Sequence, residues 1–531
     1  MDAIADFGFQ KPLYTYQAHS PSMKRTKVLL INPPYLQRTR RKKDVNVVLP
    51  LSLAYIAAVL EKNDYRVSII DSAVEGDIKK VDDGVFHVGL SFDELGEKIR
   101  EESPDVIGVS CPFPIRTKFV IETAKLIKEL SPKIKVFIGG IHPSVNYEDF
   151  LKTGYVDYVL IAEAEYTTLE LVNHIENNNP DLSDIDGIAY ADSNGEVRKN
   201  PKTKFIKNPS ELPWPARHLL KVERYFKNSA VRWDRKSKRE MSIITSRSCH
   251  QRCTFCSVHL VGGPTWRPRD PIDVVDEMEF LAKKYNAGEI ALEDDNPTVS
   301  RERMKAICNE ILKRKLKIYW KVPAGVSIRT LDREVLTLMK KSGCYSLNLP
   351  IESGDDHMLN AVMNKQLAID KVREIANIAH ELGFILNSYF IIGMPGETPQ
   401  SIRNSIELAK ELPLDKITVL FPSVLPGTAF YNECLKNDYI DKEEHMKNLT
   451  DPSLALFSDY MIKIPTMTQE ELVKHREIFY REFTMSKLKK RPLSFLYLLK
   501  RDPAAIFKLP KILLRHMIMM SKHISSTGQK A

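Results

Sequence analysis

The sequence predicts an α/β protein in which two domains of alternating strands and helices precede a helical, basic C-terminal tail. Short apolar runs alternate with segments of helical periodicity through residues 25–176, and the alternation resumes through 241–440. The excess of positive charge lies almost entirely beyond Lys487. A chain of 531 residues is also too long for one ordinary hydrophobic core, so two or three domains are expected.

The first domain, 25–176, is predicted to be a doubly wound, Rossmann-like sheet. Its first strand, "KVLLINPP" (27–34), is an apolar run that two prolines stop, as expected of a buried parallel strand. Ligands of such sheets bind beyond the carboxyl ends of the strands. Further strands are predicted at 66–71, 105–112, 135–143 and 155–165, with helices at 50–65 and 121–130. The residues at the strand ends, and therefore the candidate binding residues, are Asn32, Pro33, Ser110, Gly139, Gly140, His142, Glu163 and Glu165.

Residues 177–240 are predicted to be a connector with little core of its own. The segments "ENNNPDLSD" and "NPSELPWPARHLL" are rich in turn-forming residues, and "ADSNGEV" carries a hairpin turn signal. From Met241 a second series of about six strand–helix units runs to residue 440. Helices of this length between buried strands predict a partial parallel (β/α)6 barrel, with its site at the carboxyl ends of the strands.

The C-terminal extension, 441–531, is predicted to be helical and to end in a basic amphipathic tail. From Lys487 onward there are 11 basic residues and one acidic residue, whereas the rest of the chain has 67 basic and 68 acidic residues. This distribution argues against a nucleic-acid-binding body. Residues 506–522, placed on a helix, have apolar side chains on one face and basic ones opposite. Such a helix either lies on an anionic membrane surface or docks on the protein itself.

The chain is expected in a reducing cytoplasm, with peripheral membrane contact through the tail as an open alternative. No segment approaches the roughly 20 uninterrupted apolar residues that a membrane span needs. The N-terminal stretch "MDAIADFGFQKPLY" has acids and no apolar run, unlike a secretion signal. Seven cysteines, an odd number, in such a chain do not indicate a disulfide framework.

Three of those cysteines lie within eight positions of one loop, "SRSCHQRCTFCSV" (246–258), directly after the first barrel strand. Cys249, Cys253 and Cys256 suit either zinc or an iron–sulfur cluster. For zinc, His250 or His259 could complete a set of four ligands. Zinc sites, however, usually combine pairs of ligands from separated segments. One loop around a 4Fe–4S cube instead supplies ligands to three irons and leaves the fourth iron open. Spacing alone favours the cluster and leaves zinc or unligated thiols as alternatives.

The CxxxCxxC spacing with an aromatic residue, Phe255, before the last cysteine resembles the signature of radical S-adenosylmethionine (SAM) enzymes. Four later segments fit the same superfamily in the same order. They are "LEDDN" (292–296), "IESGDDHMLNAVMNK" (351–365), "FIIGMPGET" (390–398) and "LFPSVLPGT" (420–428).

The N-terminal half is similar to the cobalamin-binding domain of cobalamin-dependent radical SAM enzymes of the methyltransferase type. The similarity rests on "NPP", "PLSLAYIAAVLE", "GVS", "GGIHPS" and "AEAE". The chain has no Asp-x-His-x-x-Gly motif, so no histidine is marked as a lower ligand of cobalt, and His142 either shapes its loop or contacts the corrin. Relatives commonly have Gly-Glu-Gly-Glu where this chain has Ala162 and Ala164 beside Glu163 and Glu165, which limits how closely backbone and ligand approach.

The resemblance implies three cofactors: a 4Fe–4S cluster, SAM and cobalamin. The three cysteines would hold three irons, and SAM would bind the fourth through its amino and carboxylate groups. One electron then splits SAM to methionine and a 5′-deoxyadenosyl radical, which removes hydrogen from an unactivated substrate carbon. Methylcobalamin would deliver a methyl group to the substrate radical. A one-electron reductant such as a flavodoxin or a ferredoxin is the implied partner.

The resemblance also implies roles around SAM. Phe255 would pack near the adenine, and Arg329 would pair with the carboxylate of SAM as a bidentate fork. Gly393 would let the chain pass close to the adenine or turn sharply. The candidates for the SAM amino group or ribose hydroxyls, with helix capping or salt bridging as the alternative, are Asp294, Asp295 and Glu352.

The leading hypothesis is therefore a cobalamin-dependent radical SAM methyltransferase that acts on an sp³ carbon of a small-molecule or lipid-like substrate. The same motifs accommodate a non-methylating radical reaction, such as oxidative cyclisation or carbon–carbon bond formation. A corrinoid-binding sensor or electron carrier is an alternative from a different class, although it needs no open iron.

Overall fold

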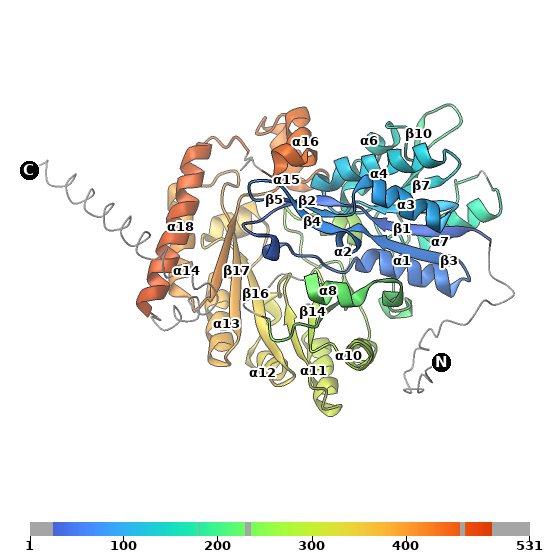
Figure 1. The fold of residues 1–531 in the computed structure, drawn as a ribbon. Helices are drawn as coiled ribbons and strands as arrows, with labels where there is room; N and C mark the ends of the chain where they lie inside the picture. Colours follow the sequence, from blue (N-terminus) through green and yellow to red (C-terminus); the bar gives the residue numbers. More distant parts are fainter. Residues whose placement is uncertain (1–24, 180, 229–234, 457–461, 491–531) are drawn as a thin grey trace, which may run out of the picture.

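A computed structural model describes residues 25–179, 181–228, 235–456 and 462–490. The predictions for the basic tail at 491–531 lie outside these ranges. Figure 1 shows the first domain, from blue to cyan, beside the green-to-orange second domain, with helix α18 (Gln469–Lys490) along the flank of the latter.

The first domain has a seven-stranded sheet in the order β10-β9-β8-β7-β6-β1-β3, of which β8, β7, β6, β1 and β3 are parallel. Successive residues of β1 enter two different cores: Leu29 and Ile31 pack with helices α3, α4 and α6, and Val28 and Leu30 with α1. A sheet buried on both faces is the doubly wound fold that the sequence predicts. The strands are β1 (Lys27–Asn32), β3 (Arg66–Asp71), β6 (Val106–Ser110), β7 (Lys135–Gly139) and β8 (Tyr158–Leu160). The helices are α1 (Leu51–Lys62), α3 (Phe92–Glu102), α4 (Thr117–Leu130), α5 (Ile141–Val145), α6 (Tyr147–Leu151) and α7 (Glu165–Glu176).

The predicted connector contributes two strands to this sheet. The hairpin of β9 (Ile188–Ala191) and β10 (Val197–Asn200) adds to β8 in the antiparallel sense, with Leu160 opposite Ile188. Ile188 and Ala189 are fully buried there. The sequence shows the turn, but a four-residue strand is too short to reveal its pairing. The sheet of the first domain therefore continues past residue 176 to Asn200.

A small antiparallel sheet that the sequence analysis does not predict follows the order β2-β5-β4. Its central strand is largely buried, while β4 is largely exposed. An exposed strand has no apolar run that periodicity can detect. The strands are β2 (Tyr35–Arg38), β4 (Asp77–Asp82) and β5 (Val85–Gly89).

The second domain is a parallel six-stranded sheet in the sequential order β11-β14-β15-β16-β17-β18, the predicted partial barrel. Each strand from β14 onward follows a helix. The strands are β11 (Glu240–Ile243), β14 (Glu289–Leu292), β15 (Tyr319–Val322), β16 (Cys344–Glu352), β17 (Ile385–Ile391) and β18 (Lys416–Leu420). The helices are α10 (Pro271–Tyr285), α11 (Arg301–Lys313), α12 (Arg333–Lys341), α13 (Ile369–Glu381) and α14 (Pro399–Glu411).

After α15 (Ala429–Lys436), the described part of the C-terminal extension is helical, with α16 (Lys442–Thr450), α17 (Pro452–Ala455) and α18. Helix α18 packs on α14 and β18, and the rings of Phe390 and Phe479 lie 5.1 Å apart. Within the ranges the structure describes, no helix combines the length and apolarity that a transmembrane segment requires.

Candidate active site

The three cysteines lie on a loop whose base is held by a short antiparallel ladder. Strands β12 (Ser246–Arg247) and β13 (Arg267–Pro268) pair with each other, with Arg247 opposite Arg267. Helix α9 (Val258–Gly262) begins two residues after Cys256. The ladder follows directly on β11, so it fixes the cysteine loop at the carboxyl edge of the six-stranded sheet.

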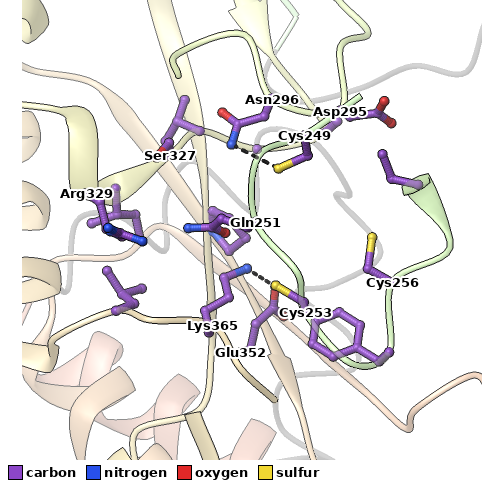
Figure 2. A pocket seen from close by; sticks show the side chains of 18 residues that line it. Cys249, Gln251, Cys253, Cys256, Asp295, Asn296, Ser327, Arg329, Glu352 and Lys365 are labelled. Carbon is purple, nitrogen blue, oxygen red and sulfur yellow. Dashed lines mark hydrogen bonds and ion pairs between the residues drawn. The ribbon is translucent and has the colours of Figure 1, made fainter. Parts of the chain in front are cut away.

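All three thiols line one cavity at that edge, as Figure 2 shows. The sulfurs belong to free cysteines, and the side-chain amide of Asn296 donates a hydrogen bond to the sulfur of Cys249 over 3.5 Å. Burial raises the pKa of the Cys256 thiol to about 12. The cavity is also lined by the predicted residues Phe255, Asp295, Arg329 and Glu352, and by Gln251, Asn296, Ser327 and Lys365.

Glu352 and Lys365 form a buried ion pair beside the cysteines. The Lys365 ammonium lies 2.9 Å from the Glu352 carboxylate, and both side chains are at most 10% exposed. Glu352 has a φ of +69°, a left-handed conformation that is uncommon for residues other than glycine. Burial raises the pKa of Cys253, and the Lys365 ammonium acts in the opposite direction. The pair thus places a positive and a negative group close to Cys253, with opposite effects on the pKa of its thiol.

Two buried oxygens of the cavity lining have no hydrogen-bond partner among the described residues: Asn296 Oδ1 and Ser327 Oγ. Buried polar atoms are rarely left unpaired, so each is a position where a ligand group or a water can supply the missing hydrogen bond. Three soft thiolate donors on one loop suit iron, and the unpaired oxygens suit the amino and hydroxyl hydrogens of SAM. The residues present therefore fit a cluster with SAM beside it.

Two predicted SAM contacts lie away from this cavity. The carboxylate of Asp294 is 1% exposed and accepts hydrogen bonds from the backbone and hydroxyl groups of Thr245 and the hydroxyl of Ser246. It therefore ties β14 to the end of β11 in place of the predicted cofactor contact. Gly393 has a φ of +95°, and a Cβ there would meet Leu472 of α18 at 3.3 Å. A glycine is needed at this position because the turn has a positive φ and because helix α18 packs close to it.

The residues predicted to contact a ligand on the first sheet share one edge of that sheet. Ser110 of β6 stands opposite Gly139 of β7, which stands opposite Leu160 of β8. The amide of Asn32 at the end of β1 donates to Asp71, and Tyr225 also donates to this buried carboxylate. Burial raises the pKa of Asp71 to about 6. The side chain of Asn32 is thus bonded within the protein.

The turn after β7 contains Gly139, Gly140 and His142. A Cβ on Gly140 would meet the carbonyl oxygen of Cys111 at 2.2 Å, so tight backbone packing requires this glycine. A Cβ on Gly139 would meet nothing nearer than 3.9 Å, which leaves the strand end open to a ligand. His142 is buried edge-on against Phe150, and burial lowers its pKa to about 4, so its ring is neutral.

The loop after β8 bonds to the cysteine loop through its two glutamates. Glu163 accepts two hydrogen bonds from Arg267, and Glu165 accepts one from Arg247. Glu165 Oε2 is buried with no partner in the described structure, and it can accept a hydrogen bond from an amide side chain of a corrin. With Gly139, this oxygen makes the edge fit cobalamin. Ala162 has a φ of +64°, where a glycine is favoured.

Two family models match the two domains separately. The B12 binding domain matches residues 40–172, and the radical SAM superfamily matches residues 243–409. The chain is a cobalamin-dependent radical SAM enzyme. Its cofactors are a 4Fe–4S cluster, SAM and cobalamin, as the sequence analysis predicts. The zinc alternative is therefore wrong. Neither His250 nor His259 lines the described cavity.

Relatives of this radical SAM enzyme include proteins with different reactions. Cytidylyl-2-hydroxyethylphosphonate methyltransferase of Streptomyces wedmorensis is 29% identical over 490 residues, which are 86% of this chain and 90% of the relative. Anaerobic magnesium-protoporphyrin IX monomethyl ester cyclase of Rubrivivax gelatinosus is 27% identical and is matched over 82% of this chain and 74% of its own. The fold is similar to that of the methyltransferase TsrM from Kitasatospora setae, with a TM-score of 0.63, 19% identity and coverage of 78% and 75%.

The sequence analysis misses four polar residues of the cavity: Gln251, Asn296, Ser327 and Lys365. Asn296 and Lys365 end two of the segments that carry the family resemblance, so their membership of these segments is the signal that could identify them. Ser327 lies in the segment after β15, where no pattern distinguishes it from other loop residues.

Proposed function

We propose that this radical SAM enzyme transfers a methyl group to an sp³ carbon of its substrate. The observation that carries the proposal is the match to a methyltransferase across 86% of the chain, which spans both cofactor domains. When bound, the cluster with SAM supplies radical chemistry and cobalamin supplies a methyl carrier. The protein contributes three thiolates and the buried Glu352–Lys365 pair, together with the side-chain oxygens of Asn296 and Ser327, which have no partner among the described residues.

The test uses the full chain, loaded with cluster and cobalamin and supplied with SAM that carries a deuterated methyl group. We expect the label first in methylcobalamin and then in a small molecule from an extract of the source cells, with release of 5′-deoxyadenosine. A product that forms with 5′-deoxyadenosine but contains no label would contradict methyl transfer. Mass spectrometry distinguishes the two outcomes.

A non-methylating radical reaction is the second candidate, because a cyclase is also among the relatives, at 27% identity. In the same experiment it predicts a product that has lost hydrogen and gained no methyl group. The label then stays in SAM and cobalamin.

Two further proposals concern partners. The electron donor is a flavodoxin or a ferredoxin, and reduced flavodoxin should support 5′-deoxyadenosine release without a chemical reductant.

The tail beyond Lys490 binds an anionic membrane surface and so favours a lipid-like substrate, because its apolar and basic side chains alternate. Flotation with anionic liposomes should separate the full chain from one that ends at Lys490. Equal flotation would overturn the membrane proposal.

A further inference from the structure

The base of the cysteine loop and the edge of the first sheet are joined by four charged side chains. Arg247 and Arg267 are cross-strand neighbours in the β12–β13 ladder, and Glu163 and Glu165 are two residues apart beyond β8. Arg247 lies 2.5 Å from Glu165, and Arg267 lies 2.7 Å and 2.9 Å from the two oxygens of Glu163. Arg247 also approaches Glu163 to 3.6 Å, which links the two pairs.

These charges are shielded from solvent, which distinguishes them from surface ion pairs. The four side chains are between 5% and 15% exposed. Burial alone would raise the pKa of Glu165, but the Arg247 guanidinium brings it below its usual value. In a low dielectric an arginine–carboxylate pair with two parallel hydrogen bonds has a fixed geometry as well as a favourable energy. We call the set Arg247, Arg267, Glu163 and Glu165 the clasp.

The clasp lies between the two segments that hold the cofactors. Arg247 precedes Cys249 by two residues, so its position fixes where the cysteine loop begins. Glu163 and Glu165 follow the strand that pairs with Gly139 of β7, at the edge that fits the corrin. A second contact runs beside the clasp, where α9, just after Cys256, packs on α5, just after Gly140.

We propose that the clasp is a set of positioning residues that sets the distance and orientation between the iron–sulfur cluster and the cobalamin. The chain connects the two domains covalently only through the long segment from 201 to 239. The ion pairs of the clasp add a direct noncovalent connection next to the segments that hold the cofactors. A displacement of about 1 Å between reacting groups lowers a rate on the order of a hundredfold. The clasp therefore affects the steps that need both cofactors more strongly than it affects SAM cleavage at the cluster.

The test measures the magnetic interaction between the reduced cluster and cob(II)alamin by electron paramagnetic resonance, in the full chain with both cofactors bound. This interaction falls steeply with distance and does not report on overall stability. We expect Arg247→Gln to weaken or broaden it, and Arg247→Lys, which keeps the positive charge beside Glu165, to weaken it less. Methyl transfer should fall on the order of a hundredfold, and by more than the release of 5′-deoxyadenosine does.

Arg314→Gln is the matched control, because Arg314 makes comparable ion pairs with Asp276 and Glu279 inside one domain and is 20% exposed. It should leave the magnetic interaction unchanged. An unchanged interaction in Arg247→Gln with both cofactors bound would overturn the proposal.

If a variant does not load both cofactors, hydrogen exchange of the cofactor-free chain tests whether the clasp positions the two segments. The near-isosteric Glu165→Gln is the second variant, since it keeps the shape of the side chain. The clasp predicts faster exchange confined to β12, β13, α9 and α5. Exchange that is unchanged, or faster throughout the chain, would count against a positioning role.

Discussion

At the carboxyl edge of the six-stranded sheet, three cysteines line one cavity, and two other lining residues, Asn296 and Ser327, have a buried oxygen without a partner among the described residues. At the same edge of the seven-stranded sheet, the polar side chains are mostly bonded within the protein: Asn32 to Asp71, Glu163 to Arg267 and Glu165 to Arg247. Both edges follow parallel strands, so both qualify by position as ligand sites. The difference shows that a strand-end position predicts where a residue lies, whereas its hydrogen-bond partners decide whether it is available to a ligand.

The largest effect should come from the open edge. Cys253→Ala removes one of three thiolates from the cavity, and we expect loss of the cluster and of 5′-deoxyadenosine release to below detection. Iron content and absorption spectra check the first, and chromatography the second. Cys308→Ala, at a buried cysteine in α11, is the matched control and should keep both. A full complement of iron in Cys253→Ala would contradict the assignment of the cluster to this cavity.

The next effect concerns the buried pair of the same cavity. Lys365→Met leaves the Glu352 carboxylate buried without its cation, and we expect the free energy of unfolding to fall by about 3–5 kcal/mol. Addition of Glu352→Gln should recover most of the loss. Chemical denaturation of the cofactor-free chain measures both.

Lys371→Met is the control for that pair, because Lys371 and its partner Glu374 are 25% and 50% exposed. A surface pair contributes less than about 1 kcal/mol. If both lysine variants lost the same stability, burial would not be the reason for the Lys365 effect.

A smaller, pH-dependent effect should come from the bonded edge. Burial raises the pKa of Asp71 from 3.8 to about 6, so the folded state holds this proton more tightly than the unfolded state does. Its stabilising contribution is complete below a pH of about 4 and is lost as pH rises through about 6, by at most about 3 kcal/mol. Unfolding of the wild type and Asp71→Asn across this range tests the sign. A stability difference that grows in favour of the wild type with rising pH would contradict it.

The smallest effect is expected at Ala162, which has a φ of +64° beside the clasp. Ala162→Gly relieves the left-handed strain but makes the unfolded chain more flexible, so stability should change by less than about 1 kcal/mol. Thermal unfolding measures the change. Ala164→Gly, at a φ of −109°, lacks the strain relief and should be the less stable of the two variants.

The sequence by itself determines the fold class and the grouping of the three cysteines. Continuous apolar runs such as the one within 27–34 indicate the parallel strands, because a strand that is buried on both faces has apolar residues on both sides. Three cysteines within eight positions stay close together in any fold, because the chain itself connects them over a short distance. Short or exposed strands, including β4, β9 and β10, escape the sequence because their burial pattern is weak or brief.

Only the tertiary structure decides which strand-end residues remain available to a ligand. Asp294 and Asp295 are adjacent, yet Asp294 is bonded to Thr245 and Ser246 while Asp295 lines the cavity. Arg247 and Glu165 lie 82 positions apart, and nothing local to either residue predicts their contact. Hydrogen bonds and ion pairs between distant segments depend on how the two domains pack, which periodicity and spacing do not encode.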